Sequence, residues 1–350
     1  MKIKSTRPAN PRKVFQAVGV TGLALFLLAM FLSPFLFMVF TAIKSPQQMS
    51  ALDAPIWPAK QATYTYQGKD LEIFKVPQAD GSIKNLAMLK PGRASSVFID
   101  PANPQGGEIT WEGSWRTLKR PWVWAPRWEN FAEVWKLINF PRLFGNTLFL
   151  AVSTEIGVLI SCTLVAYGFA RFRFPGRNFL FTVLISTIFL PAAVTTIPMY
   201  TFFLKINWVG TYLPLIVPAF FANAYDVFLL RQFFLTIPHE MDEAAMIDGA
   251  GPFRIFWSII LPQSMPVLLA VSVFHIVYAW NDYYNPLIYL STRPELQPIA
   301  VAMARFNGIH STNPHLIQAT ALMALVVPLV IFIAAQRYFM QGLVFTGVEK

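Results

Sequence analysis

Charged side chains are scarce in this sequence. Asp, Glu, Lys and Arg make up 13% of its 350 residues, and hydrophobic residues make up 55%. In ordinary soluble domains about a quarter of the residues are charged. The shortage excludes an ordinary soluble domain and predicts an integral membrane protein.

Cysteine is almost absent, because Cys162 is the single one and lies within an apolar segment. It cannot form an internal disulfide, so we interpret it as a small packing residue. His310 and His315 flank a polar loop, but no carboxylate or cysteine cluster accompanies them. We therefore expect no metal site.

Catalytic and nucleotide-binding motifs are also missing. The sequence contains no G-x-x-x-x-G-K-[ST] phosphate loop, no G-x-S-x-G elbow and no H-E-x-x-H pair. We expect a chain that is not an enzyme and binds no cofactor of its own. The net charge of +10 is partly explained by basic residues that flank apolar segments, so nucleic-acid binding is not expected.

Six apolar stretches without Lys or Arg are long enough, at about 20 residues, to cross a bilayer as helices. The predicted spans cover roughly residues 17–43, 145–170, 178–204, 210–230, 262–281 and 315–336. The first run is longer than the apolar part of a secretory signal, so we interpret it as a retained anchor. The predicted fold is an all-α integral membrane protein with six transmembrane helices.

Positive charges predict the orientation. Five basic residues precede the first span, and three more fill the connection between the second and third spans: Lys2, Lys4, Arg7, Arg12, Lys13, Arg171, Arg173 and Arg177. Short basic segments stay in the cytoplasm. We therefore expect a cytoplasmic N-terminus (1–16), a cytoplasmic tail (337–350) and a cytoplasmic connection between spans four and five.

A long polar segment, residues 44–142, separates the first two spans and is expected outside the cytoplasm. It holds seven of the ten tryptophans: Trp57, Trp111, Trp115, Trp122, Trp124, Trp128 and Trp135. Two alternating runs, 63–66 and 71–74, flank a probable turn at 67–70. The segment predicts an extracytoplasmic, β-rich insert with its core at about 60–120, followed by an interfacial helix over 128–135.

The connection at 235–261 predicts a helical hairpin beside the membrane. Acidic residues suit the start of a helix at 238–242, Asp248-Gly249 breaks the run, and an apolar period resumes over 253–260. Small side chains permit close approach by a partner, and Glu243 can form a charge-assisted bond. The expected contact residues are Glu243, Ala244, Ala245, Asp248, Gly249, Ala250 and Phe253.

The run EAAMIDGAGPFRIFWSIILP, which begins at Glu243 and ends at Pro262, is similar to the signature loop of permease subunits of ATP-binding-cassette importers. From Asn130 onward, about two-thirds of the chain resembles the second permease of maltose-type carbohydrate importers. The residues that carry this resemblance are Asn146-Thr147, Ala166–Arg171, Phe174–Arg177, Pro191, Ile197-Pro198, Phe228–Phe234, Trp280–Asp282, Gln336–Phe339 and Gly342. The insert around 60–120 departs from the family, whose members usually join these spans by a shorter segment.

The resemblance implies the type I importer permease fold, with its core at 143–336, in the cell membrane of a bacterium or archaeon. It implies that the loop at 235–261 docks on an ATPase dimer, and that ATP and Mg belong to that dimer. The other implied partners are a second permease, an extracytoplasmic sugar-binding protein and membrane lipid. The loop between spans five and six resembles a segment that contacts the binding protein; its candidate residues are Arg305, Asn307 and Asn313.

Polar and aromatic residues in the spans suggest a sugar pathway, because aromatic faces stack on sugars and amides bond to hydroxyls. The candidates are Tyr200, Asn223, Tyr225, Asp226, Trp280, Asn281 and Asp282. Glu155 and Asp226 are costly in hydrocarbon, so each should face the pathway or pair with a neighbour, such as Asp226 with Arg231. An alternative function is an ion-coupled secondary transporter that uses Glu155 and Asp226. Such a carrier needs no docking hairpin.

Overall fold

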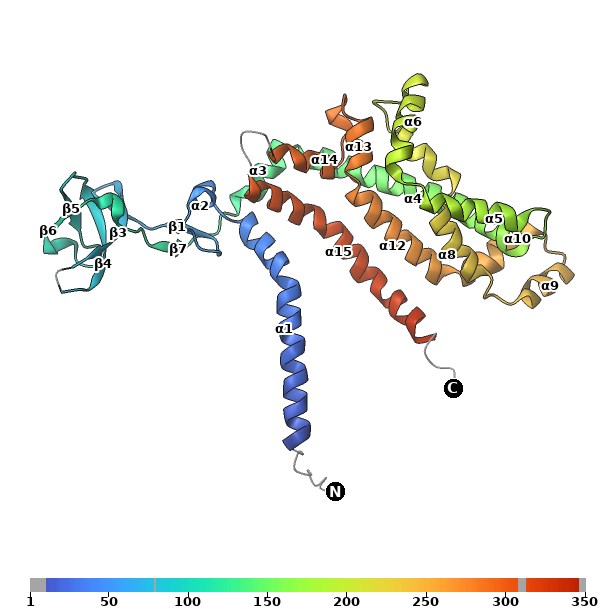
Figure 1. Ribbon diagram of the computed structural model, residues 1–350, viewed down its shortest axis with the longest axis horizontal. Coiled ribbons are helices and arrows are strands. Elements are labelled where there is room, and N and C mark those ends of the chain that lie inside the picture. The colour runs from blue at the N-terminus through green and yellow to red at the C-terminus, as the bar shows by residue number, and fades with distance from the viewer. Residues whose placement is uncertain (1–10, 79, 308–312, 346–350) are drawn as a thin grey trace. The chain divides into compact units, whose positions relative to one another are not determined.

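A computed structural model describes residues 11–78, 80–307 and 313–345 (Figure 1). The predicted basic residues Lys2, Lys4 and Arg7 lie outside these residues, as does His310. The chain divides into two compact units, one formed by residues 1–132 with 313–322 and the other by residues 133–312 with 323–350. Each unit has its own core.

The first unit begins with a 32-residue apolar helix, α1 (Pro11–Ala42). Every side chain from 18 to 37 is exposed. A helix that is apolar on all faces and covered by no protein suits hydrocarbon. After α1, the short helix α2 (Pro46–Ser50) is capped by Ser45, whose Oγ accepts from the Gln48 backbone N–H at 3.2 Å.

Buried amides hold the segment after α1 in place. The Asn130 Nδ2 donates to the carbonyls of Ala42 and Lys44, both at 2.8 Å. The Gln48 Oε1 accepts from the Ala59 backbone N–H at 2.9 Å. These bonds form a stem that is closed by an antiparallel pair, β1 (Ala59–Gln61) with β7 (Trp122–Trp124).

A five-stranded antiparallel sheet occupies the segment between β1 and β7. Its strands follow the chain order: β2 (Thr63–Tyr66), β3 (Lys69–Pro77), β4 (Ile83–Lys90), β5 (Ser95–Ile99) and β6 (Glu108–Glu112). Gln67 and Gly68 join β2 to β3 with φ of 48° and 78°, as a type I′ turn requires. Phe74, Leu86 and Phe98 form the centre of its core, so the sheet buries its own apolar face.

The second unit is helical and is built around α4 (Phe140–Arg171), which packs against α8 (Ala224–Phe234) and α12 (Met265–Asn281). The other α-helices are α3 (Glu129–Leu137, which starts in the first unit), α5 (Arg177–Ser186), α6 (Ala192–Lys205), α7 (Leu213–Ile216), α9 (His239–Ile247), α10 (Pro252–Ile255), α11 (Leu261–Gln263), α13 (Tyr284–Tyr289), α14 (Ile299–Met303) and α15 (Pro314–Phe345, which starts in the first unit). A π-helical turn, Phe256–Ile260, lies between α10 and α11. Short 3-10 turns of this unit cover Thr187–Phe189, Val217–Phe221, Pro294–Leu296 and Ala304–Phe306. Two further 3-10 turns, Pro104–Gly106 and Trp115–Thr117, belong to the first unit.

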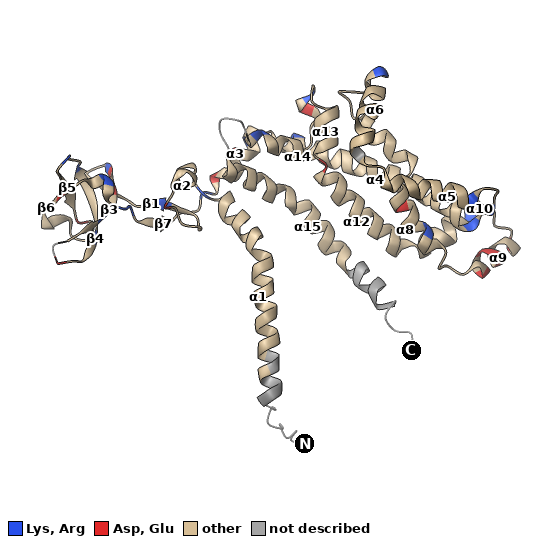
Figure 2. Ribbon diagram, viewed as in Figure 1, with Lys and Arg blue, Asp and Glu red and all other residues tan. Residues whose placement is uncertain are grey.

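Among the described residues, four helical segments are long and apolar enough to cross a membrane: Val18–Ala42, Phe140–Arg171, Leu213–Phe234 and Pro314–Gln336. Two bent pairs raise the number to six if each pair is one span; these are Arg177–Phe189 with Ala193–Lys205, and Pro252–Gln263 with Met265–Asn281. In Figure 2, α12 and α15 as far as Gln336 show no charged residues, whereas α9 and α10 carry them.

Two of the predicted spans contain a bend that the sequence did not predict. The span expected over 178–204 is not one straight helix but bends by 99°, because Pro191 takes an extended backbone before α6 and has no N–H for a helical bond. The loop was expected to end at Leu261, yet α11 continues to Gln263 and the break falls at Ser264, with a bend of 76°. The last predicted span, 315–336, agrees with the apolar segment Pro314–Gln336, and α15 itself continues to Phe345.

Candidate functional site

The hairpin between α8 and α12 has the helix–turn–helix form that its sequence predicts. Glu240 and Asp242 lie in the first turn of α9, where acids favour the helix dipole. Gly249 has φ of 81°. Its N–H bonds to the Met246 carbonyl at 3.0 Å, and the Ala250 N–H bonds to the Ala245 carbonyl at 2.9 Å. This pair of bonds is the Schellman ending of a helix, so Gly249 sets the turn.

Arg171, the last residue of α4, fixes the first arm of the hairpin. Its Nε lies 3.2 Å from Asp242 Oδ2, and the two side chains are 4% and 9% exposed. Its Nη2 donates to the Ile237 carbonyl at 2.9 Å. The sequence identified Arg171 only as a charge that sets orientation and Asp242 only as a helix-start acid, so this buried pair was not predicted.

Tyr167, one turn earlier on α4, fixes the second arm. Its hydroxyl donates to the Pro252 carbonyl at 3.0 Å, and its ring lies 4.9 Å from the Phe256 ring, centroid to centroid. Both arms of the hairpin are therefore fastened to one end of α4. A force on the hairpin would reach that helix directly.

The outer surface of the hairpin exposes three large apolar side chains. Ile247 is 88% exposed, Phe253 72% and Met246 56%. The predicted contact residues Glu243, Ala244, Asp248 and Gly249 are exposed beside them. Ala245 and Ala250 instead pack against the core below, so they hold the hairpin to its own unit. Large apolar side chains at full exposure next to small residues form a surface suited to a protein partner.

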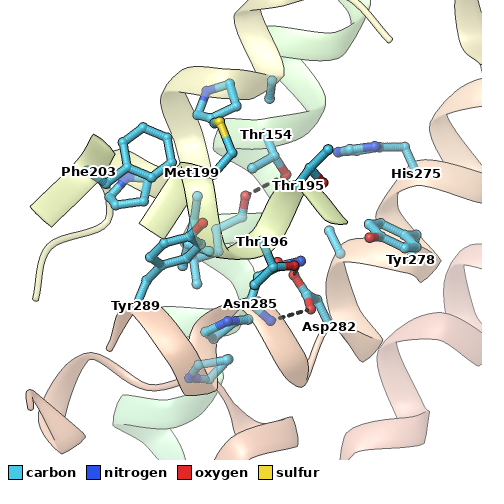
Figure 3. Close-up of a pocket in the computed structure, with 18 residues that line it drawn as sticks. Thr154, Thr195, Thr196, Met199, Phe203, His275, Tyr278, Asp282, Asn285 and Tyr289 are labelled. Carbon is cyan, nitrogen blue, oxygen red and sulfur yellow. Dashed lines mark hydrogen bonds between the residues drawn. The ribbon is translucent and has the colours of Figure 1, made fainter. Parts of the chain in front are cut away.

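The helical unit also contains a cavity of about 300 Å³ (Figure 3). Residues of α4, α6, α7, α12 and α13 line it. Its polar side chains are Thr154, Thr195, Thr196, His275, Tyr278, Asp282, Asn285 and Tyr289. Apolar contact comes from others, including Met199 and Phe203. The mixture of a few polar groups with an apolar wall is typical of small-molecule sites.

Hydrogen bonds and ring contacts order the wall near α13. The Asn285 Nδ2 donates to Asp282 Oδ2 at 3.0 Å. Tyr200 stacks on Tyr289 with ring centroids 6.2 Å apart. Burial raises the pKa of the Tyr289 hydroxyl, which therefore stays protonated and able to donate.

Of the predicted pathway residues, Asp282 lines the cavity and Tyr200 lies behind its wall. The others lie elsewhere. Trp280 is buried and its Nε1 donates to the Ala324 carbonyl at 3.0 Å. The Asn281 side chain bonds to the Val277 carbonyl of its own helix at 2.8 Å. Tyr225 is 54% exposed and is not among the cavity residues.

Asn223 and Asp226 organise the start of α8. The Asn223 Oδ1 accepts from the Asp226 backbone N–H at 2.9 Å, as an N-cap does. Its Nδ2 donates to Asp226 Oδ2 at 2.6 Å. The suggested pairing of Asp226 with Arg231 does not form: Arg231 donates to the Phe169 carbonyl at 3.3 Å and covers the Phe181 ring.

Glu155 is 7% exposed, and Ser272 and Asp226 lie near its carboxylate. It is not among the residues that line the cavity, although its neighbour Thr154 is.

The cavity residues that were missed share a signal that the sequence did contain. On α6 the lining residues recur at intervals of four: Thr195, Met199 and Phe203. At the end of α12 they recur at intervals of three and four: His275, Tyr278 and the predicted Asp282. Such spacing places side chains on one helix face.

The candidate contacts for a binding protein flank residues 308–312, which lie outside the described residues. The Arg305 Nη2 donates to Gln297 Oε1 at 2.8 Å. The Asn313 carbonyl accepts from the Leu316 backbone N–H at 3.0 Å, at the start of α15. Asn307 follows the last 3-10 turn. Within the described residues, no group of three His, Cys, Asp or Glu side chains could hold a metal ion.

A helical membrane unit with an exposed hairpin and a polar cavity fits a transport permease. Residues 157–344 match the family described as binding-protein-dependent transport system inner membrane component, and the chain belongs to that family. The predicted membership among permease subunits of ATP-binding-cassette importers is confirmed. The chain is a multi-pass membrane subunit and not an enzyme, and family membership argues against an ion-coupled secondary transporter.

The chain matches most of the length of two curated relatives. The osmoprotective compounds uptake permease protein GgtD of Synechocystis sp. is 28% identical over 258 residues, which are 73% of this chain and 86% of GgtD. The sn-glycerol-3-phosphate transport system permease protein UgpE of Brucella suis biovar 1 is 35% identical over 211 residues, 60% of this chain and 74% of UgpE.

Solved structures of similar fold come from a bacterial importer of the acidic polysaccharide alginate. One chain matches with a TM-score of 0.65 at 17% identity, over 96% of this chain and all (100%) of that one. A chain of the alginate transporter in complex with a pentasaccharide-bound periplasmic protein matches with a TM-score of 0.51 at 19% identity, over 60% of this chain and 81% of that one. These likenesses establish the importer permease fold.

Proposed function

We propose that this chain is one permease of an ATP-driven carbohydrate importer and forms half of its translocation pathway. Six spans, counting each bent pair as one, would put both termini on the same side of the membrane, and the basic residues near the N-terminus and in the second connection favour the cytoplasm. The partners are a second permease, an ATPase dimer that binds ATP and Mg, and an extracytoplasmic sugar-binding protein. The names of the relatives, which concern osmoprotective compounds, a glycerol phosphate and alginate, support an import role for hydroxyl-rich compounds.

The fastened hairpin is the observation that carries the proposal. It presents Met246, Ile247 and Phe253 to a partner on one side and is tied to α4 through Tyr167 and Arg171 on the other. ATP-driven closure of the ATPase dimer would push α9, and the tied α4 would tilt with it.

The second arm offers a further path for the same movement. It enters the membrane through the π-helical turn at 256–260 and the bend at Ser264. Ser264 Oγ donates to the Ile260 carbonyl at 2.6 Å, which stabilises the bend. The hairpin movement would therefore change the angle of α12, which carries His275 and Tyr278 of the cavity wall.

The docking role is tested by Ile247→Asp. Ile247 is 88% exposed and so contributes little to packing within its own unit, and we expect the variant to reach the membrane in normal amount. A charge in an apolar interface should abolish co-purification of the ATPase and reduce sugar uptake at least about tenfold, as loss of a central apolar contact does.

Ile83→Asp is the matched control, because Ile83 is 67% exposed on β4 of the sheet. It should leave ATPase co-purification unchanged. Retention of the ATPase by Ile247→Asp, with normal uptake, would remove the docking assignment.

The β-rich insert is proposed to lie outside the cytoplasm and to contact the binding protein or the second permease. Its support is positional, because it follows the first span directly and emerges on the face where a binding protein delivers its ligand. The candidate residues Arg305, Asn307 and Asn313 are proposed to contact the same binding protein.

A further inference from the structure

The wall of the cavity carries a negative charge and no positive one. Asp282 lines it, and none of its 18 lining residues is Lys or Arg (Figure 3). At pH values above the ordinary pKa of a histidine, His275 adds no charge. A ligand in this cavity therefore meets one carboxylate among neutral donors and acceptors.

The cations nearest in sequence to the lining residues of α13 are already engaged. The Arg293 Nε bonds to Glu295 Oε1 at 2.6 Å. The Arg305 Nη2 bonds to Gln297 Oε1 at 2.8 Å and to the Pro294 carbonyl at 3.3 Å. Neither residue lines the cavity, so neither offsets Asp282 inside it.

The remaining groups suit vicinal hydroxyls. A carboxylate has about four acceptor sites. Asp282 accepts two hydrogen bonds from Asn285, one from its backbone N–H at 3.3 Å and one from its side-chain Nδ2 at 3.0 Å. The free capacity of Asp282 can accept from two hydroxyls, while Thr196 and Tyr278 can donate or accept.

The size of the cavity limits the ligand. Its volume of about 300 Å³ lies at the lower end of ligand cavities, which span about 300–1,000 Å³. One or two sugar rings, or a small polyol, would fill it. A phosphate or carboxylate group would face Asp282 with no cation to balance it, and desolvated like charges repel strongly.

We propose that this cavity is a subsite for an uncharged polyhydroxyl compound and that Asp282 rejects sugars that carry phosphate or carboxylate groups. The inference rests on the proposed import function and gives it a substrate class. It sets this chain apart from a relative named for sn-glycerol 3-phosphate and from the importer of acidic alginate.

The first test measures the charge of the cavity without a ligand. Thr196→Cys is made in the full chain, assembled with its transport partners in nanodiscs at pH 8. Cys162 stays in place because it is fully buried. The thiol is reacted with one of two methanethiosulfonates, the cationic trimethylammonium-ethyl or the anionic sulfonatoethyl reagent. The rate of each reagent is divided by its rate at Ser291→Cys, an exposed position outside the lining.

We expect the cationic reagent to react about tenfold faster at Thr196→Cys after this correction, since a carboxylate raises the local concentration of cations. Adding Asp282→Asn should bring the ratio close to one. Equal corrected rates in the parent, or a ratio that Asp282→Asn does not change, would overturn the proposal.

The second test measures protection of Thr196→Cys by sugars. The uncharged probes are glycerol, sucrose, trehalose and maltose; the anionic probes are sn-glycerol 3-phosphate and glucuronate. Slower labelling with at least one uncharged probe and with neither anion is the expected result. Protection by an anion, or by no probe, would overturn the subsite.

These outcomes separate the inference from the function on which it rests. If the importer assignment fails, Ile247→Asp will not change the co-purification of the ATPase. The ratio of the two reagent rates at Thr196→Cys will then be unaffected. Failure of the subsite would appear as equal reagent rates in a complex that retains its ATPase and its uptake.

Discussion

At the scale of single residues, Arg171 is the side chain on which the hairpin depends most. It neutralises Asp242 in a buried pair and also holds the Ile237 carbonyl. Breaking one partner of a buried pair is costly because the other charge is left unbalanced. The same residue therefore serves both the packing of α9 and its connection to α4.

We predict that Arg171→Gln loosens the hairpin and greatly lowers uptake. The unpaired Asp242 should cost about 3–5 kcal/mol locally, and hydrogen exchange across residues 239–247 should rise. Arg173→Gln, at an exposed position of the same connection, is the matched control and should behave as the parent does. Combining Arg171→Gln with Asp242→Asn should restore part of the protection; if it restores none, the ion pair is not what holds the hairpin.

From residue types alone, only part of the cavity lining could be predicted. Asp282 could be predicted, because a carboxylate at the end of an apolar run is conspicuous. Trp280 has a partner that no local pattern reveals, because the Ala324 carbonyl lies 44 positions along the chain. Asn223 caps α8, and a side chain that caps a helix looks the same in sequence as one that binds a ligand.

At the scale of elements, local sequence rules predicted the turns better than the breaks. Asp248-Gly249 and the turn at Gln67-Gly68 were both placed correctly, because glycine at positive φ leaves a strong signal. The bends at Pro191 and Ser264 were not, because prolines occur inside α1, α6 and α15 without ending them. Whether a helix bends at a proline depends on the packing around it.

The ending of α9 gives a second prediction at this scale. Gly249 has φ of 81°, with no atom within 4 Å of an added Cβ, so Gly249→Ala would cost backbone strain alone. That strain is about 1–2 kcal/mol. The amides of Gly249 and Ala250, which close the helix end, should exchange roughly 5–30-fold faster.

Gly251→Ala is the control for this strain. Gly251 has φ of −75° and equally open space around it, so alanine adds no left-handed strain there and costs only about 0.5–1 kcal/mol as a poorer helix cap. Equal exchange rates in the two variants would show that the left-handed turn is not a source of strain.

At the scale of the whole molecule, the insert has the properties of a separate folding unit. Its sheet has a core of its own around Phe74, Leu86 and Phe98. Its two ends meet at the stem, where the Ala62 N–H bonds to the Pro121 carbonyl at 2.9 Å. Gln48 and Asn130 hold the stem to the end of α1 independently of the sheet. A domain with close termini and its own core can be removed without unfolding the rest.

Replacing residues 63–118 by a short Gly/Ser linker should therefore leave the membrane helices assembled and the ATPase bound, because the stem and the hairpin are untouched. If the insert contacts the binding protein, the deletion should weaken the binding-protein complex at least about tenfold, as removal of a standard interface does. Pull-down with the sugar-loaded binding protein and uptake at limiting sugar measure this. Replacing Lys84 and Asn85, two exposed residues of β4, by alanine tests the sheet surface without deleting the fold. Unchanged affinity and uptake in the deletion would mean that the insert contributes neither to docking nor to transport, and its core would then serve only its own stability.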